Sequence, residues 1–154
     1  MGLHMTLEEF LPYVKKSLDA TFRRARGIET EKSNQYSKVL HDLCADVDIL
    51  KDGRFNKQLE LQCLCVHPNY GNKGLGMKLV RLSEEKGKDL GCDVATIQAV
   101  NAVTDHIAKK TGYTTVRRVD VRDIRDETGR PLLDLEAVRE GTGTSYFTYY
   151  MKKL

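Results

Sequence analysis

The feature that most constrains this chain is a glycine-rich segment between an alternating apolar run and a helical repeat of leucines. Residues 59–66 alternate as a β-strand does, are expected to be buried on both faces toward their end, and stop before Pro68. Residues 74–90 repeat leucine at or near helical spacing until Gly91. Between the two runs stands VHPNYGNKGLG, residues 66–76. The pattern predicts a strand, a tight loop and a helix in direct succession.

A loop of this kind favours an anion. The first turn of a helix leaves backbone N–H groups without partners, and the helix dipole adds partial positive charge there. Glycine at Gly71, Gly74 and Gly76 would allow phosphate to approach the backbone or allow a positive φ, and Lys73 adds a charge. The segment lacks the Gly-Lys-Ser/Thr of a nucleoside-triphosphate loop and is not a clean dinucleotide fingerprint. On the pattern alone, glycines that merely tighten a strand-to-helix turn are an equally good interpretation.

The hydrophobic period along the rest of the chain predicts one mixed α/β or α+β domain. A chain of 154 residues is long enough for one core, and the order of elements implies a twisted sheet with parallel members, flanked by helices. The predicted elements are helices at 6–26 (capped by Thr6 with Glu9), 36–47 and 102–110, strands at 94–100, 115–124 and 145–151, a turn at 126–131, and a loop or short strand at 132–144. Residues 1–5 are expected to be vector-derived or disordered, which leaves 6–154 as the domain.

Composition argues against several classes of function. The net charge is +3 and the basic residues are scattered, which gives no reason to expect nucleic acid as a partner. No apolar run approaches the ~20 residues of a membrane-spanning helix, and no signal-peptide core is present. We therefore expect a cytoplasmic protein with no membrane partner.

The four cysteines lie in apolar runs, which predicts buried thiols rather than disulfides. They are Cys44, Cys63, Cys65 and Cys92. A metal site built from Cys63, Cys65 and His67 is disfavoured, because at ~3.3 Å per residue the outer two lie about 13 Å apart. Zinc ligands must converge within ~2.0–2.3 Å of the ion. No metal is expected.

Two motifs in order carry a family resemblance. V-x-P followed by G-x-G at a helix start, and then Asn101 before a short helix that ends in Gly112-Tyr113, resemble the acetyl-CoA-binding motif of the GNAT N-acetyltransferases. The run at 83–91, the turn at Gly129 and the ending TYYMKKL resemble the invertebrate arylalkylamine N-acetyltransferase branch. The resemblance implies the GNAT acyl-CoA N-acyltransferase fold, acetyl-CoA as cosubstrate without a metal, and a monomer or homodimer. It also implies transfer of acetyl to a primary amine, such as a small arylalkylamine, by direct attack with no acyl-enzyme.

The resemblance also implies which residues form the site. Acetyl-CoA would be held by the end of the first strand, the glycine loop and the starts of two helices, through Leu64, Cys65, Val66, Gly71, Asn72, Lys73, Gly74, Leu75, Gly76, Met77, Asn101 and Thr104. The backbone N–H of Val66 would polarise the thioester carbonyl. Glu60 is the candidate base, and its other interpretation is a solvated glutamate at the start of a strand.

Departures from the family pattern keep a second function open. Gly71-Asn72 replaces the usual Arg or Gln before Gly, Ala108 replaces a tyrosine acid, and Thr104 is the only hydroxyl where the branch has serines. Residues 6–58 contain only predicted helices, so the family's N-terminal strands are expected to be missing. The alternative is a GNAT-like domain that binds acetyl-CoA or a partner with little or no turnover.

The aromatic ending has two interpretations. Tyr146, Tyr149 and Tyr150 would either supply a substitute acid and line an amine pocket, or simply fill the core.

Overall fold

A computed structural model describes residues 31–44, 47–51, 53–62 and 64–154, with side chains from Lys38 onward. The chain divides into two units, Met1–Lys38 and Val39–Leu154, and the second contains the whole sheet. The predicted helix at 6–26, its Thr6 cap and residues 1–5 lie outside the described residues.

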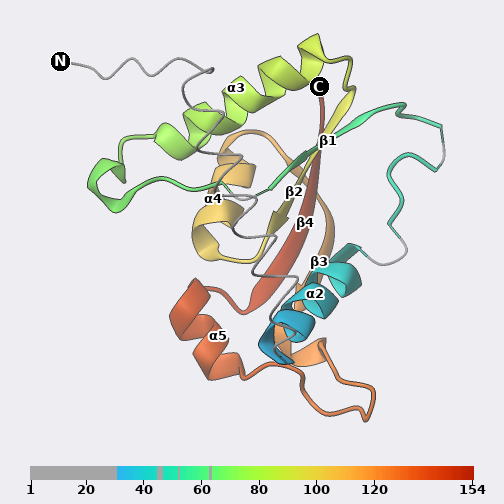
Figure 1. Cartoon of the computed structure of the whole chain (residues 1–154), viewed down its shortest axis with the longest axis vertical. Coiled ribbons are helices and arrows are strands. Elements are labelled where there is room, and N and C mark those ends of the chain that lie inside the picture. The colour runs from blue at the N-terminus through green and yellow to red at the C-terminus, as the bar shows by residue number, and fades with distance from the viewer. Residues whose placement is uncertain (1–30, 45–46, 52, 63) are drawn as a thin grey trace. The chain divides into compact units, whose positions relative to one another are not determined.

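A mixed sheet of four strands, in the order β1-β2-β4-β3, forms the centre of this unit (Figure 1). β1 is parallel to β2, and β4 is antiparallel to both β2 and β3, with an irregularity in β3 between Thr115 and Arg117. The strands are β1 (Gln58–Leu61), β2 (Val94–Ala99), β3 (Thr114–Asp120) and β4 (Tyr146–Lys153). The predicted mixed α/β architecture is confirmed.

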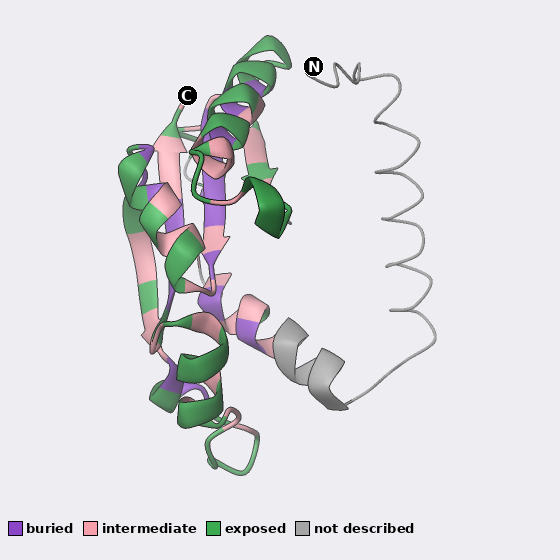
Figure 2. Cartoon of the chain, turned by 90° about the vertical axis from the view of Figure 1, so that its left-hand side faces the viewer, coloured by how far each residue is buried: buried purple, intermediate pink, exposed green. Residues whose placement is uncertain are grey.

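Helices cover both faces of the sheet. They are α2 (Glu31–Cys44), α3 (Leu75–Asp89), α4 (Ala102–Lys110) and α5 (Leu135–Thr142), with short 3₁₀ turns η1 (Pro68–Tyr70) and η2 (Val121–Asp123). On one face, Val80 of α3 and Ala108 of α4 pack against β2 and β4. On the other, Val39 and Leu43 of α2 pack against Tyr149 and its neighbours. Figure 2 shows the buried residues concentrated on the central strands and the inner sides of the helices.

Four predicted elements are confirmed within a residue or two, and a fifth overlaps the observed helix. The helix predicted at 102–110 is α4, the helix at 74–90 is α3, and the helix at 36–47 overlaps α2, which ends at Cys44. The strands predicted at 94–100 and 145–151 are β2 and β4. None of the described helices has the length and apolar character needed to cross a bilayer.

The strand predicted at 59–66 is wrong in its second half. β1 ends at Leu61, and the following residues carry no strand assignment where they are described. Leu64 and Val66 are half-buried, and Cys65 is exposed, which also corrects the prediction of a buried thiol there. An apolar residue stands at position 64 because Leu64 packs against the core beneath α3, not because it pairs in a strand. Cys44 and Cys92 are half-buried thiols, and Cys63 lies outside the described residues.

Two further predictions need correction near the end of the chain. The strand predicted at 115–124 stops at Asp120, whose carboxylate accepts the N–H of Arg122 at 2.8 Å and starts η2. The segment 132–144, predicted as loop or short strand, contains α5. Asp134 caps α5 by accepting the N–H of Ala137 at 3.0 Å. These local side-chain bonds give the backbone an alternative to strand pairing.

Candidate functional site

The parallel pair β1 and β2 opens at its carboxyl end. Its register joins Gln58–Leu61 to residues 94–97, whereas β2 continues to Ala99 while paired with β4. The chain beyond Leu61 therefore leaves the ladder and runs through Leu64 and Val66 toward η1. Ligands of parallel sheets bind at the carboxyl ends of strands, and backbone groups at such an opening can pair with an extended ligand.

The loop after this opening is held tightly by its own hydrogen bonds. The ring nitrogen Nδ1 of His67 accepts the N–H of Asn69 at 3.3 Å, and the carbonyl of Pro68 accepts the N–H of Gly71 at 3.0 Å. A Cβ on Gly71 would lie 3.2 Å from the Pro68 carbonyl oxygen. Asn72 then takes a positive φ of 57°. The segment is a defined turn that delivers the chain to the start of α3.

The amino end of α3 has no counter-charge of its own. Gly74 is its N-cap with a φ of 72°, no side chain among the described residues caps it, and its first turn has no acidic residue. The N–H groups of Leu75, Gly76 and Met77 have no partners within the helix. Lys73 stands just before them, with Nζ 5.5 Å from the ring centre of Tyr70. This end of the helix suits a phosphate group.

Gly76 has a packing reason of its own. A Cβ at this position would come within 2.8 Å of Cδ1 of Ile107, so glycine lets α3 approach α4 closely. Among Gly71, Gly74 and Gly76, Gly74 is the one with a positive φ, a conformation that favours glycine.

The start of α4 lies at the end of β2. Asn101 is the N-cap, and its side-chain oxygen accepts the N–H of the half-buried Thr104 at 2.8 Å, which leaves the amide NH₂ for other partners. Ala108, one turn further, is completely buried. Ala108 shares its core cluster with Tyr150 of β4, whose hydroxyl donates to Asp105 Oδ1 at 2.6 Å. No acid can act from position 108.

Asp105 gathers partners around the first turn of α4. Burial alone would raise its pKa, but hydrogen bonds from Lys109 and Tyr150, with the charges of Lys109 and Arg118, hold the pKa below its usual value. Tyr149 and Tyr150 are 5% and 1% exposed, which confirms their interpretation as core, whereas Tyr146 is 45% exposed, so the core interpretation is wrong there.

A polar row crosses the opposite face of the sheet, the face covered by α2. It consists of Glu60 on β1, Gln98 on β2, Tyr149 on β4 and Arg117 on β3; the last three are neighbours in the strand register. Gln98 Nε2 donates to Glu60 Oε1 at 3.3 Å and to the sulfur of Cys44 at 3.0 Å. Glu60 is exposed.

Charges of the polar row act on the Cys44 thiol. Burial and then the Glu60 carboxylate raise its pKa, while the hydrogen bond from Gln98 and the charge of Arg117 oppose the rise. Burial also raises the pKa of Tyr149. The sequence pattern does not single out Gln98 and Cys44 as site residues. The only hint it contains is the alternation along β2, which places Gln98 on the same face as Thr96.

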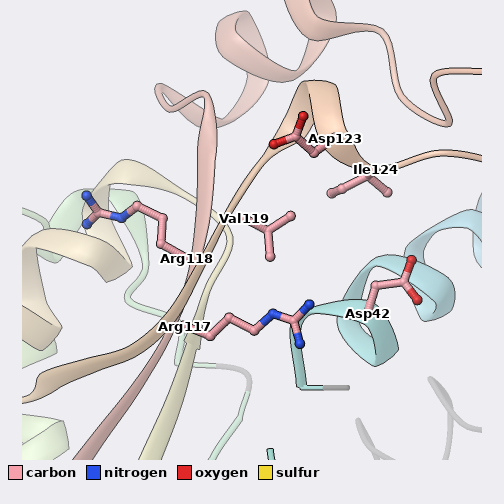
Figure 3. A pocket seen from close by; sticks show the side chains of 6 residues that line it. All are labelled: Asp42, Arg117, Arg118, Val119, Asp123 and Ile124. Carbon is pink, nitrogen blue, oxygen red and sulfur yellow. The ribbon is translucent and has the colours of Figure 1, made fainter. Parts of the chain in front are cut away.

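The polar row ends at a hollow of about 390 Å³ between α2, β3 and η2 (Figure 3). Its lining is Asp42, Arg117, Arg118, Val119, Asp123 and Ile124. Arg117 extends toward α2, whereas Arg118 leaves β3 on the opposite side. Carboxylates, a guanidinium and two aliphatic side chains thus surround the hollow. Within the described part of the chain, no three His, Cys, Asp or Glu side chains come together as a metal site would need.

Comparison with known proteins identifies the family to which the chain belongs. The sequence model of the Acetyltransferase (GNAT) family matches residues 16–113, more than half of the chain. A search of curated proteins found no significant match. Among solved structures, arylalkylamine N-acetyltransferase 2 of Aedes aegypti superposes with a TM-score of 0.71 and 21% identity, over 88% of this chain and 60% of that one.

Two other solved structures agree. The polyamine N-acetyltransferase of Drosophila melanogaster has a TM-score of 0.70 and 16% identity, over 88% of this chain and 63% of its own. A mosquito arylalkylamine N-acetyltransferase-like protein, 5b, has a TM-score of 0.64 and 24% identity, over 88% of this chain and 62% of its own. The chain spans less than two thirds of the length of these proteins, and at such identities the likeness establishes the fold. Together with the family match, it shows that this chain belongs to the GNAT family of acetyltransferases.

Proposed function

We propose that this chain is an N-acetyltransferase that moves the acetyl group of acetyl-CoA to a small primary amine, with arylalkylamines as the first candidates. The observation that carries the proposal is the uncompensated amino end of α3, which the chain reaches through η1 after it leaves the opening between β1 and β2. In a member of the GNAT family, this is the arrangement that a pyrophosphate and an extended pantetheine arm would use. Polyamines are a second class to test, because one similar structure is a polyamine N-acetyltransferase.

The residues present fit acetyl-CoA. The N–H groups of Leu75, Gly76 and Met77 would hold the pyrophosphate, with Lys73 supplying a charge and Gly71-Asn72 leaving room beside it. Backbone groups of Leu64, Cys65 and Val66 would pair with the pantetheine arm. Asn101, whose amide NH₂ is left after capping, and Thr104 would contact the arm from α4.

Acetyl-CoA supplies an acetyl group already activated as a thioester. Val66 would donate its backbone N–H to the carbonyl oxygen as negative charge develops there. Glu60 would take the proton from the acceptor's ammonium, directly or through water, so that a neutral amine attacks the thioester carbon. As the C–N bond forms and the C–S bond breaks, coenzyme A would leave as its thiolate and take up the second proton that the nitrogen loses. Glu60 is exposed, on the α2-covered face of the sheet, and so is within reach of an acceptor.

The proposal is tested by following free thiol release from acetyl-CoA in the presence of arylalkylamines and agmatine. We expect release above the blank with at least one amine, and a loss of about 100-fold or more in kcat for Glu60→Gln if Glu60 is the base. Retained thermal stabilisation by acetyl-CoA without release for any amine would instead favour the second function, a binding domain without turnover.

Glycines that flank the two ends of α3 give the coenzyme loop a matched control. Gly74→Glu places bulk and negative charge at the amino end of α3, so acetyl-CoA should no longer raise the melting temperature. Gly91, just beyond the other end of α3, has a similar φ of 79° and open space around it, so Gly91→Glu imposes the same backbone strain away from the loop. An equal response to acetyl-CoA in both variants would show that the loop does not hold the pyrophosphate.

A further inference from the structure

We infer that Gln98 is a positioning residue on the acceptor side of the site: its amide holds the Glu60 carboxylate at the opening between β1 and β2 and ties it to α2 through Cys44. The inference rests on the proposed function, in which Glu60 is the base. Gln98 itself touches neither of the reacting groups, so it acts through Glu60.

The position of Gln98 at the end of the ladder is the first argument. The last residue of β2 paired with β1 is Ile97, and Gln98 follows it while still paired with Tyr149 of β4. The backbone partner of Glu60 is Thr96, so the bond from Gln98 Nε2 to Glu60 Oε1 runs diagonally, toward the opening. The side chains thus bridge the two strands where their backbones stop pairing.

The rigidity of the amide's mounting is the second argument. Gln98 lies between Ile97 and Ala99, which are 4% and 1% exposed, in a strand paired on its β4 side. Its single Nε2 has two N–H groups, one for the carboxylate at 3.3 Å and one for the Cys44 sulfur at 3.0 Å. Glu60 is exposed, and a surface glutamate loses substantial rotamer freedom when it is fixed. The amide gives the proposed base one preferred orientation before an acceptor arrives.

The titration of the Cys44 thiol gives a measure of this arrangement that does not depend on enzyme activity. Its thiol faces Glu60 from β1, Gln98 from β2, Arg117 from β3 and Tyr149 from β4. The carboxylate raises the thiol pKa, and the hydrogen bond from Gln98 lowers it. Removing the carboxylate should therefore move the thiol titration to lower pH, and the size of that shift depends on whether the carboxylate is held beside the thiol.

The first experiment compares Gln98→Leu with Gln58→Leu, both checked for their melting temperature. Gln58 is a half-buried amide on the same face that donates to Thr96 Oγ1 at 2.7 Å and to the Tyr149 hydroxyl at 3.4 Å, and not to Glu60. We expect Gln98→Leu to lower kcat/KM for the amine about tenfold, with KM for acetyl-CoA within twofold of the parent, because only the base is displaced. Gln58→Leu should stay within twofold for both. Parental kcat/KM in Gln98→Leu would overturn the inference.

The second experiment follows alkylation of Cys44 by iodoacetamide between pH 7 and 10, read from the peptide that contains it. Glu60→Gln should move the titration to lower pH, and should do so less in the Gln98→Leu background, where the carboxylate is no longer held beside the thiol. An equal shift from Glu60→Gln in both backgrounds would overturn the inference even if the enzyme is active. A parent that acetylates no amine would refute the proposed function separately, and the comparison of the two backgrounds would then still decide whether Gln98 holds Glu60.

Discussion

At the scale of single residues, Lys152 neutralises a carboxylate that folding has almost removed from water. Its Nζ lies 2.8 Å from Glu84 Oε2 and also donates to the Thr111 carbonyl at 2.8 Å, while Glu84 is only 7% exposed. Glu84 Oε1 and the Tyr113 hydroxyl, both buried, have no hydrogen-bond partner among the described residues. Burial and the neighbouring Glu84 carboxylate raise the pKa of Tyr113. The ammonium is therefore the main compensation for this charge.

Loss of that ammonium should be costly. Lys152→Met leaves the Glu84 carboxylate buried without its partner, and we expect the free energy of unfolding to fall by about 2 kcal/mol, less than for a fully buried pair because Lys152 is 29% exposed. Lys109→Met removes an ion pair in which the lysine is 53% exposed and should cost about 0.5 kcal/mol. Urea unfolding of both variants checks the comparison. Equal losses would show that Glu84 is compensated by something else.

The glycines show which residue-scale features the sequence could predict. A positive φ is one of two reasons that the loop pattern offers for Gly71, Gly74 and Gly76, and of these three the structure has it at Gly74. The tight contact of Gly76 with Ile107 depends on how two helices cross, which no local pattern contains. The bond between Gln98 and Cys44 joins residues 54 positions apart and depends on the strand order and on where α2 lies.

At the scale of elements, α5 shows why a short helix escapes a reading of hydrophobic period. Its eight residues carry only Leu135 and Val138 against the core, too few to establish a helical repeat. The Asp134 cap and the Gly143 end were visible in the sequence, but each is also common in loops. The long helix α3 was predictable from leucines at helical spacing and from Gly91 just beyond it, although Leu79 and Leu82 are exposed and Val80 is the residue that packs in the core.

Gly143 holds α5 against the start of α4, which predicts an unequal pair of substitutions. Gly143 has a φ of 70°, and a Cβ there would lie 3.2 Å from the Cβ of Ala102, whereas Gly129 has a φ of 82° and open space. Gly129→Ala should lower the free energy of unfolding by about 1 kcal/mol, because alanine disfavours the left-handed backbone conformation. Gly143→Ala should cost about 1 kcal/mol more, because α4 or α5 must move. Thermal unfolding measures both, and similar melting temperatures would contradict close packing of the two helices.

At the scale of the whole sheet, the two faces divide the proposed work. The face covered by α3 and α4 holds the helix ends that would bind the coenzyme, and the face covered by α2 holds the polar row with Glu60. The opening between β1 and β2 is where the two faces meet. Sequence order predicted the alternation of strands and helices, but not which side chains lie beside one another on a face, because β4 inserts between β2 and β3.

The free energy of unfolding should depend on pH through two aspartates, Asp120 at the end of β3 and Asp126 in the turn that follows η2. Hydrogen bonds from the Thr128 side chain and the Arg130 backbone lower the pKa of Asp126 to about 2, and the side chain of Arg122 lowers that of Asp120 to about 2. A folded pKa below the unfolded value of about 3.9 contributes stability that is complete above that value and is lost as the pH falls toward the folded pKa.

The urea midpoint should therefore be nearly level from pH 7 to 5 and fall between about pH 4 and 2. Asp126→Ala lacks one of these ionised carboxylates, so it should be less stable than the parent at pH 7, and the difference in stability should narrow as Asp126 of the parent gains a proton. Part of the difference should persist at pH 2, because a protonated Asp126 can still accept the Thr128 and Arg130 N–H groups that it binds at 2.8 and 3.0 Å. A difference that stayed constant over the whole range would mean that the charge of Asp126 does not stabilise its turn.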